Sequence, residues 1–238
     1  MRRIARLLAL SGGLALAVGG GVAAWSAFGP RELALEDGSL ERLGDYGGVP
    51  DFALIERSGR RVTLADLLGT VWIANFIYTQ CTETCPVQSL QIRRLQDDFA
   101  GVRDLRFVSI TVDPERDTPA VLRQYAERYQ AGPGHWLFLT GPKQAIYALA
   151  KDGFKLSVVD ASAQGQRSGV GFALAPSPAF ASHGSTGLIV HSSRFVLVDR
   201  QARIRAYHLA TDEESMARLR ANLRRLLAEP ARREGWTT

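Results

Sequence analysis

Two cysteines, Cys81 and Cys85, are the only ones in the chain of 238 residues, and they lie four positions apart in the stretch YTQCTETCPV. The thiolate is the form of cysteine that attacks disulfides and binds soft metal ions. Pro86 follows the second cysteine, and proline is tolerated at the first position of a helix. At a helix start, residues four apart face the same side, and the amide groups there stabilise a thiolate. The pair therefore indicates either a metal site or a redox-active dithiol.

Two structural roles compete with this interpretation. A disulfide between Cys81 and Cys85 would close a very short loop, so it would remove little chain entropy from the unfolded state. A structural zinc site needs a closed set of four ligands, and the chain has no second cysteine pair to complete one. We favour a pair that does chemistry over both of these roles.

A third ligand for a metal would come from one of four histidines. We expect His135 and His208 to lie at strand ends near the surface. His183 lies in an irregular segment, where holding a fixed geometry would cost ordering entropy. His191 enters the segment RFVLVD, and in a thioredoxin-like sheet the loop that enters this hairpin lies against the redox-active helix start. His191 is therefore the candidate third ligand.

The segment before the cysteines is predicted to be a buried strand. Residues 70–78, TVWIANFIY, form a continuous apolar, β-branched and aromatic run, which is typical of a strand covered on both faces. The helix after Cys85 is expected to end near Gly101. Its apolar residues, which would face the core, are Val87, Leu90, Leu95 and Phe99.

The rest of the chain alternates strands with helices, and this alternation argues for an α/β sandwich. A first hairpin turns at Ser58-Gly59, and a last hairpin turns at residues 199–202 before a closing amphipathic helix. Residues 161–187 are dominated by Ala, Gly, Ser and Pro, and we interpret them as an inserted loop before that last hairpin. The other expected elements are strands at residues 105–112, 136–139 and 156–159 and helices at residues 65–68, 118–129, 142–150 and 212–229.

The first residues of the chain have the composition of a membrane-spanning helix. No charged residue lies between Leu7 and Phe28, and roughly 20 apolar residues cross a hydrocarbon core as a helix. Arginines precede this stretch, which places the N-terminus in the cytoplasm and the rest of the chain outside. A cleaved signal peptide is the alternative, and it also exports the domain. We expect a transmembrane anchor at residues 1–29, a tether at 30–50, the folded domain at 51–228 and a C-terminal tail at 229–238.

The net charge does not point to a nucleic acid partner. The chain carries +5, but three of these charges come from Arg2, Arg3 and Arg6 and no acid lies in residues 1–30, which leaves +2 for the rest. A nearly neutral domain lacks the basic surface that phosphate binding needs. Arginine is used almost everywhere in place of lysine, which favours a bacterial chain, an inner-membrane anchor and a domain in the periplasm. The mitochondrial intermembrane space is the alternative.

A second acidic motif, DPERDTP, follows the strand expected at residues 105–112. Asp117 or Thr118 would cap the helix that Pro119 opens, and we favour this structural role for Asp117. Asp113 stands at the strand end beside the expected site, where it would orient metal ligands without binding the metal itself. For Asp113 the sequence does not separate this role from a structural one.

Three motifs in this order, FIYTQCTETCP, SITVDPERDTP and VHSSRFVLVD, resemble the Sco/SenC family of thioredoxin-fold copper proteins. The resemblance spans roughly residues 50–228 and implies a thioredoxin-like three-layer sandwich. It also implies that the two copper-binding cysteines and the histidine ligand of the family fall on Cys81, Cys85 and His191. The chain departs from the family pattern in the long insert before His191 and in the turn RQA, which lacks an expected glycine.

The resemblance implies a copper-binding metallochaperone rather than an enzyme. Such a protein delivers copper to the dinuclear copper centre of cytochrome c oxidase, and its partner is the oxidase subunit that carries this centre. Two thiolates and an imidazole suit Cu(I), while Cu(II) is also compatible with them. Oxidation to a disulfide would remove both thiolates, so copper loading is expected to depend on redox state. The only methionines, Met1 and Met216, argue against a methionine-rich copper carrier.

The main alternative function is a membrane-anchored thiol-disulfide oxidoreductase that reduces the cysteines of the same oxidase copper site. A peroxiredoxin-like peroxidase is disfavoured, because that family places its threonine three residues before the cysteine. In this chain Thr79 stands two residues before Cys81.

Overall fold

The computed structural model describes residues 40–156, 159–160, 188–189 and 193–230. Their centre is a seven-stranded sheet in the order β2-β1-β5-β4-β3-β8-β9. The three middle strands β5, β4 and β3 are parallel, and the outer strands pair antiparallel with their neighbours. The strands are β1 (Ala53–Glu56), β2 (Arg61–Thr63), β3 (Val71–Ile77), β4 (Leu105–Thr111), β5 (Trp136–Thr140), β8 (Arg194–Val198) and β9 (Ile204–Leu209).

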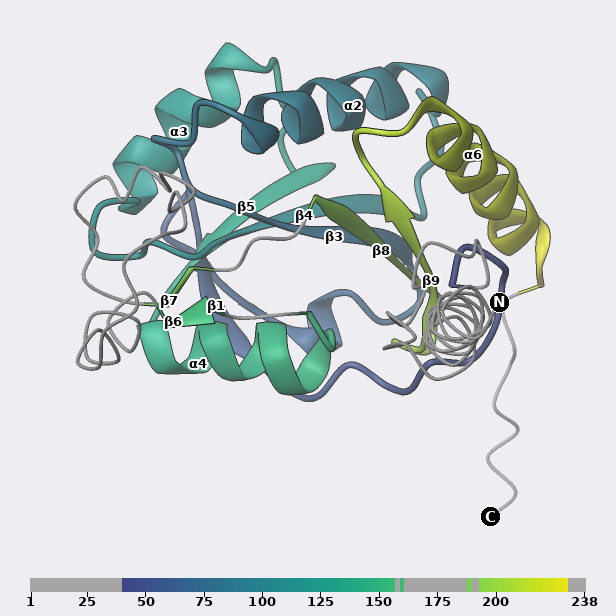
Figure 1. The fold of residues 1–238 in the computed structure, drawn as a ribbon, viewed down its shortest axis with the longest axis horizontal. Helices are drawn as coiled ribbons and strands as arrows, with labels where there is room; N and C mark the ends of the chain where they lie inside the picture. The colour runs from purple at the N-terminus through teal and green to yellow at the C-terminus, as the bar shows by residue number, and fades with distance from the viewer. Residues whose placement is uncertain (1–39, 157–158, 161–187, 190–192, 231–238) are drawn as a thin grey trace, which may run out of the picture. The chain divides into compact units, whose positions relative to one another are not determined.

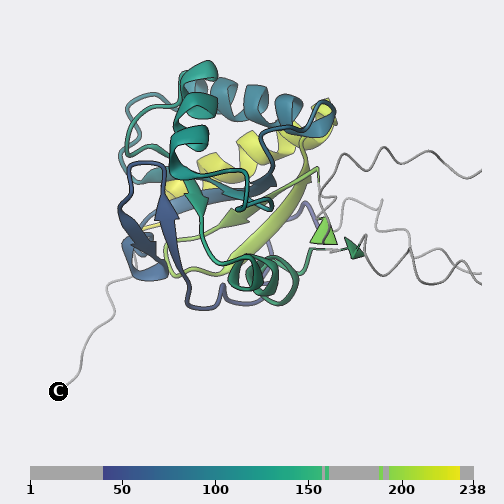
Figure 2. The ribbon, with the colours of Figure 1, turned by 90° about the vertical axis from the view of Figure 1, so that its left-hand side faces the viewer.

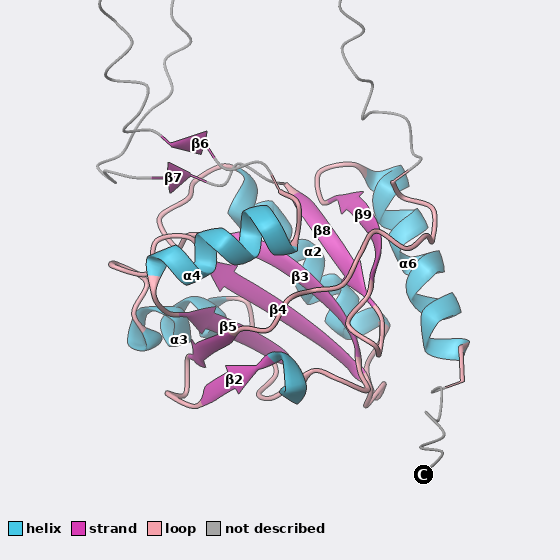
Figure 3. Cartoon of the chain, turned by 90° about the horizontal axis from the view of Figure 1, so that it is seen from below, coloured by secondary structure: helices cyan, strands magenta, loops and turns pink. Residues whose placement is uncertain are grey.

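Helices cover both faces of this sheet (Figures 1 and 2). Helices α2, α3 and α6 lie on one face, and α4 lies on the other, where Figure 3 shows it in front of the strands. The helices are α2 (Thr84–Asp98), α3 (Pro119–Arg128), α4 (Lys143–Ala148), which continues as a π-helical turn (Leu149–Gly153), and α6 (Glu213–Ala228). A 3₁₀ turn, η1 (Leu64–Asp66), follows β2. The predicted three-layer α/β sandwich is confirmed.

Strand β3 contributes to the apolar cores on both faces of the sheet. All seven of its residues are buried. Trp72 and Phe76 belong to the core under α4, whereas Ile73 and Ile77 belong to the core under α2, α3 and α6. Successive side chains of a strand point to opposite faces, so a strand covered on both sides is apolar throughout. The end of β3 at Ile77 determines where the chain turns towards the cysteines.

Helix α2 begins earlier than expected, and its first turns bury polar residues in place of the expected apolar ones. It starts at Thr84, so Pro86 occupies its third position rather than its first. No hydrogen bond is lost, because the first four amides of a helix have no partner within it. Val87 and Leu90, predicted to face the core, are 38% and 53% exposed.

Polar residues of α2 take the buried positions instead. Gln88 and Ser89 are almost completely buried. The Nδ2 of Asn75 donates to Gln88 Oε1 at 2.8 Å, and the hydroxyls of Ser89 and Tyr125 are 2.9 Å apart. A buried polar group is tolerated when it has such a partner. Leu95 and Phe99 are buried as predicted, so the apolar pattern identified only the later part of the inner face.

The other predicted elements form within two residues of their expected ends, except for the strand at residues 156–159. That strand is represented by β6 (Val159–Asp160), which pairs with β7 (Leu188–Ile189) in a separate two-stranded sheet. The insertion at 161–187, the predicted anchor at 1–29 and His191 lie outside the described residues. Within the described ranges, none of the helices combines the length and the apolar character needed to cross a bilayer.

Residues 40–49, which we expected to belong to the tether, run along the edge of β9. The amides of Gly44 and Tyr46 donate to carbonyls of β9, and the amide of Tyr207 donates back to this segment, each at 2.9 Å. These bonds satisfy backbone groups that an open sheet edge would leave unpaired. The folded part therefore starts before the predicted boundary at Asp51.

The last hairpin turns at residues 199–202, as predicted. Ala202 adopts φ +58°, which is a left-handed conformation that favours glycine. The position where a glycine was expected is therefore occupied by a strained alanine.

Candidate metal and redox site

Cys81 and Cys85 lie where the chain leaves β3 and enters α2. A hydrogen bond from Cys81 N to Tyr78 O, at 3.1 Å, closes a turn directly after the strand. Cys85 lies in the first turn of α2, and its N–H donates to the sulfur of Cys81 at 3.4 Å. The side chain of Glu83, at the N-cap position, makes no capping bond, so this sulfur takes the place of a capping oxygen. The structure brings the two cysteines together as free thiols.

The two thiols differ in acidity. A hydrogen bond from the Cys85 thiol, together with bonds from the amides of Cys85 and Glu83 and from Tyr78, lowers the pKa of Cys81, although burial opposes the shift. The same bond to Cys81, followed by burial, raises the pKa of Cys85. One proton is therefore shared by the two sulfurs, and the directions of the two pKa shifts favour the thiolate form at Cys81 and the thiol form at Cys85.

The two sulfurs also differ in access. Cys85 is only 3% exposed, whereas Cys81 is half-buried. Tyr78 packs beside the pair, and burial, followed by its hydrogen bond to Cys81, raises the pKa of its phenol. The sulfur of Cys81 is therefore the more accessible of the two.

The DPERDTP motif lies beside this turn, but Asp117 is not the helix cap that we favoured. The cap of α3 is Thr118, whose hydroxyl accepts a hydrogen bond from Val121 N at 3.4 Å. Asp117 is 1% exposed, and its carboxylate accepts hydrogen bonds from Thr79 and Thr111. The cap prediction considered only residues adjacent in sequence. The partners of Asp117 come instead from the cysteine turn and from the end of β4.

Asp113 is linked to the Asp117 carboxylate through Thr111. Its N–H donates to Thr111 Oγ1 at 3.0 Å, and its carboxylate is 3.8 Å from Arg116 Nε. Arg116 also donates to Gln80 Oε1 at 3.1 Å, next to Cys81. In the described part of the chain, Asp113 is therefore linked to the cysteine turn through Arg116.

The histidines are distributed over the molecule. His135 precedes β5, is half-buried and packs edge-on against Phe107, with ring centroids 5.3 Å apart. The prediction that His208 lies at the surface is wrong: it is 0% exposed, because α6 and the segment 40–49 cover β9. Among the residues that the structure describes, which exclude His191, no three His, Cys, Asp or Glu side chains are grouped to hold a metal ion.

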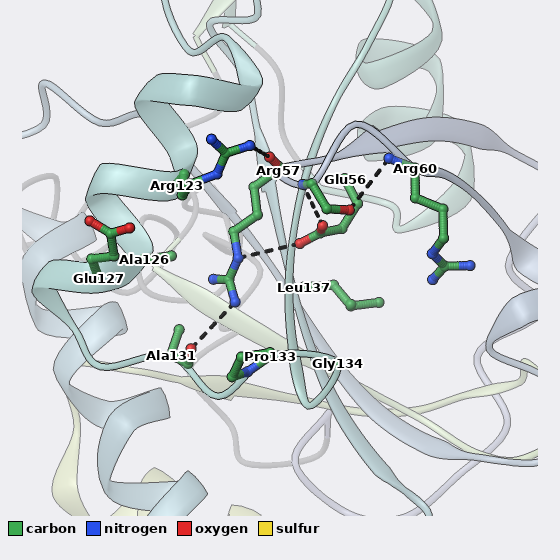
Figure 4. Close-up of a pocket in the computed structure, with 11 residues that line it drawn as sticks. Glu56, Arg57, Arg60, Arg123, Ala126, Glu127, Ala131, Pro133, Gly134 and Leu137 are labelled. Atoms are coloured by element: carbon green, nitrogen blue, oxygen red, sulfur yellow. Dashed lines mark hydrogen bonds and ion pairs between the residues drawn. The ribbon is translucent and has the colours of Figure 1, made fainter.

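A cavity of about 370 Å³ lies near the start of β5, at the end of the parallel strands opposite to the cysteines. Figure 4 shows the side chains that line it. It is bounded by the β1–β2 hairpin, α3 and the loop before β5. Arg57 lies along it, with Nε 3.5 Å from Glu56 Oε1 and Nη2 donating to Ala131 O at 3.3 Å. Its guanidinium also lies over the ring of Phe138, at 5.2 Å from the centroid. Among the residues that the structure describes, no cysteine or histidine lines this cavity, so it is separate from the cysteine pair.

Comparison with known proteins decides the family. The family model described as SCO1/SenC matches residues 43–228. The chain belongs to the SCO1/SenC family. It is 37% identical over 112 residues to the SCO1 protein homolog of Bacillus subtilis (strain 168), in a match that covers 46% of this chain and 58% of that protein. This SCO1/SenC chain spans about half the length of the curated relatives it matches.

Solved structures of the family share the fold. BsSco, described as a member of the Sco family of cytochrome c oxidase assembly proteins with a disulfide switch, aligns with a TM-score of 0.60 and 25% identity over 79% of this chain and 97% of its own. Bradyrhizobium japonicum ScoI with copper bound aligns with a TM-score of 0.56 and 22% identity over 76% of this chain and 99% of its own. The mixed sheet and its helices are therefore those of the thioredoxin-like Sco fold.

Proposed function

We propose that this SCO1/SenC protein binds copper through Cys81, Cys85 and His191 and delivers it to the cytochrome c oxidase subunit that carries the dinuclear copper centre. The observation that carries this proposal is the reduced cysteine pair at the start of α2, with the Cys81 sulfur held at the Cys85 amide. The copper bound by ScoI and the oxidase assembly family of BsSco support the metal and the partner.

The donor set favours Cu(I). Thiolates are soft ligands, and two of them with one imidazole leave an open edge from which a partner can take the ion. Cu(II) is also compatible with the imidazole. Because the pKa of Cys85 is raised, copper binding releases the proton that the pair holds.

The sheet register supports His191 as the third ligand. Strand β8 is antiparallel to β3, with Ala74 opposite Val196, so the start of β8 lies beside the end of β3. In the sequence His191 precedes β8 by a few residues, and β8 begins on the side where β3 leads into the cysteines. Asp113, linked through Arg116 to the cysteine turn, would orient this site without binding the metal.

We further propose that the domain acts in the periplasm, tethered to the inner membrane by residues 1–29. The uncharged stretch from Leu7 to Phe28 and the arginines before it support this location. Fractionation of cells that express the full chain would test it: release of the protein without detergent would contradict the anchor.

The test of copper binding is an anaerobic Cu(I) competition titration against a chromophoric chelator, on the reduced full chain in mild detergent. We expect one copper ion per chain and no tight binding in the double variant Cys81→Ser/Cys85→Ser. His191→Ala should weaken binding by more than the roughly 10–100-fold that loss of an outer partner of a ligand costs.

His135→Ala is the matched control for the histidine variant, because His135 packs against Phe107 away from the cysteines. It should bind copper as the wild type does. Absence of tight copper binding in the wild type would contradict the proposal, and equal affinity in His191→Ala and His135→Ala would exclude His191 from the ligands.

A thiol-disulfide oxidoreductase is the second candidate, because the half-buried Cys81 favours the thiolate form and the buried Cys85 keeps the proton. The Cys81 thiolate would attack a partner disulfide, form a mixed disulfide and release one partner thiol. Cys85, after losing its proton, would then attack the Cys81 sulfur, leaving the partner fully reduced and this pair oxidised. Failure of Cys85→Ser to trap a mixed disulfide with any oxidase subunit would exclude this role.

A further inference from the structure

Two consecutive residues of the cysteine turn are held by the loop at residues 113–118. Thr79 donates its N–H to Asp117 Oδ2 at 3.0 Å and its hydroxyl to Oδ1. The next residue, Gln80, accepts a hydrogen bond from Arg116 at 3.1 Å. Cys81 follows directly, so its backbone position depends on these contacts.

The loop that holds the turn is itself fixed to the sheet. The amide of Asp117 donates to Asp113 O at 2.8 Å, and Thr111 at the end of β4 donates its hydroxyl to the Asp117 carboxylate. One carboxylate therefore joins the strand end and the cysteine turn. We call Thr79, Thr111 and Asp117 the Asp117 cluster.

The Asp117 cluster contains a buried carboxylate that is not paired with a cation in the described part of the chain, which is unusual for a purely structural contact. Asp117 is 1% exposed, and its hydrogen-bond donors in the described part of the chain are all neutral. Burying a carboxylate without a cation costs free energy, which a neutral amide in the same place would avoid. A carboxylate, however, has two oxygens that only accept, so it can bind the amide and the hydroxyl of Thr79 at the same time.

We propose that Asp117 is a positioning residue for the dithiol, which holds the cysteine turn so that the Cys81 sulfur stays at the Cys85 amide. The preorganised turn stabilises the reduced pair and presents both sulfurs for a metal ion without a conformational cost at binding. The part that concerns copper rests on the proposed function, and the part that concerns the dithiol does not.

The experiment compares Asp117→Asn and Thr79→Val with the wild type, using the reduced full chain in detergent. Asparagine keeps the shape of Asp117 but replaces an accepting oxygen with a donor, and valine replaces the Thr79 hydroxyl with a methyl group. The first readout, Cu(I) affinity by competition, should fall about tenfold in both variants, at the low end of what outer partners of metal ligands contribute.

The second readout needs no metal. The reduced chain is equilibrated with glutathione disulfide, which takes two electrons from Cys81 and Cys85 and yields the intramolecular disulfide and two reduced glutathiones. Both variants should shift this equilibrium about tenfold towards the disulfide, because the hydrogen bonds that stabilise the reduced pair are lost. This shift corresponds to a change of about 30 mV in the reduction potential of the pair.

Thr70→Val is the matched control. It also removes one threonine hydroxyl bond, to Leu67 O at 2.7 Å, but lies before β3, away from the cysteines. Thr70→Val should lower the urea midpoint about as much as Thr79→Val does. It should leave the Cu(I) affinity and the glutathione equilibrium unchanged. The proposal would be overturned if Asp117→Asn and Thr79→Val, like Thr70→Val, left the Cu(I) affinity and the glutathione equilibrium unchanged.

The two readouts separate the proposals. If the wild type binds no Cu(I), the copper function fails and the glutathione equilibrium still decides whether Asp117 positions the pair. If Asp117→Asn does not fold, Thr79→Val decides alone, because the backbone bond of Thr79 to Asp117 remains in it.

Discussion

Two clusters are built around buried carboxylates, and they differ in what balances the charge. In the Asp117 cluster, burial raises the pKa of Asp117, and the nearby Asp113 acts in the same direction. Glu41, in the segment along β9, is 8% exposed. Burial would raise the pKa of Glu41, but hydrogen bonds from Arg218 and Ser215 outweigh this effect and lower it. A cation compensates Glu41, whereas the described donors to Asp117 are neutral.

The surroundings of Glu41 show what a stabilising cluster looks like. Ser215 Oγ donates to Glu41 Oε1 at 2.6 Å, and Asn222 Nδ2 donates to Glu41 O at 2.7 Å. His208 Nε2 is 3.2 Å from the same Asn222 nitrogen. These contacts join the N-terminal segment to α6 and β9. We call Glu41, His208, Ser215, Arg218 and Asn222 the Glu41 cluster.

The contrast separates stability from positioning. The Glu41 cluster ties chain segments together with a compensated charge, which stabilises the fold. The Asp117 cluster leaves a charge uncompensated beside the cysteines, which costs stability. A loss of stability of this kind is expected at functional sites, where residues are selected to hold a particular geometry.

The largest effect should come from acid acting on the Glu41 cluster. Burial lowers the pKa of His208 from 6.5 to about 4, so the unfolded chain binds this proton more readily than the folded one. The contribution of His208 is therefore complete above pH 6.5 and is lost as the pH falls towards 4. The shift corresponds to about 3 kcal/mol of unfolding free energy, measured by urea unfolding across this pH range.

The structural reason is the amide of Asn222. An amide nitrogen only donates, so His208 Nε2 must accept and therefore carries no proton. His208→Gln, which keeps an acceptor but does not titrate, should have a flatter stability profile between pH 6.5 and 4 than the wild type. Identical slopes in the two proteins would assign the acid sensitivity to other groups.

The second effect concerns the Asp117 cluster. Asp117→Ala removes the acceptor of two hydroxyls and one amide, and buried donors without partners cost about 1–3 kcal/mol each. Because burial of the carboxylate is relieved at the same time, we expect a net loss of about 2 kcal/mol in urea unfolding at neutral pH.

Asp117→Asn sharpens this comparison, since it buries no charge and should cost less than about 1 kcal/mol. Equal losses in the alanine and asparagine variants would mean that the charge of Asp117 has no influence on stability, and the contrast with Glu41 would disappear.

The third effect concerns the carboxylate whose charge is compensated. Glu41→Gln removes a charge that Arg218 compensates, so it should cost about 1 kcal/mol at neutral pH, where Asp117→Asn costs less. The pKa of Glu41 is lowered below 4.5, so its contribution is present above that pH and is lost as the pH falls through the folded value. Urea unfolding at neutral pH and at pH 3 should therefore show a difference between variant and wild type that shrinks in acid.

The smallest effect on the unfolding free energy is expected in the hairpin between β8 and β9, where no buried charge is involved. Ala202→Gly relieves the positive φ in the last hairpin and should raise the unfolding free energy by about 0.5–1 kcal/mol. It should leave the pH dependence assigned to His208 unchanged. A destabilised glycine variant would show that chain entropy outweighs the strain at this turn.

The sequence by itself determined the features that contiguous residues dictate. The run before the cysteines is apolar at almost every position because β3 is covered on both faces, so its type and its end could be predicted. The three ordered motifs, including the step from Cys81 to Cys85, were enough to predict the SCO1/SenC family that the family model confirms.

Only the tertiary structure decided how polar side chains are buried. The partners of Asp117 lie 38 and 6 positions away, in the cysteine turn and on β4, so its neighbours in sequence suggested a helix cap instead. His208 was predicted at the surface, and its cover comes from α6 and from a segment expected to be a tether. Gln88 and Ser89 likewise displaced Val87 and Leu90 from the inner face of α2. A polar group is buried when other elements supply its hydrogen-bond partner, and those partners are brought together only when the chain folds.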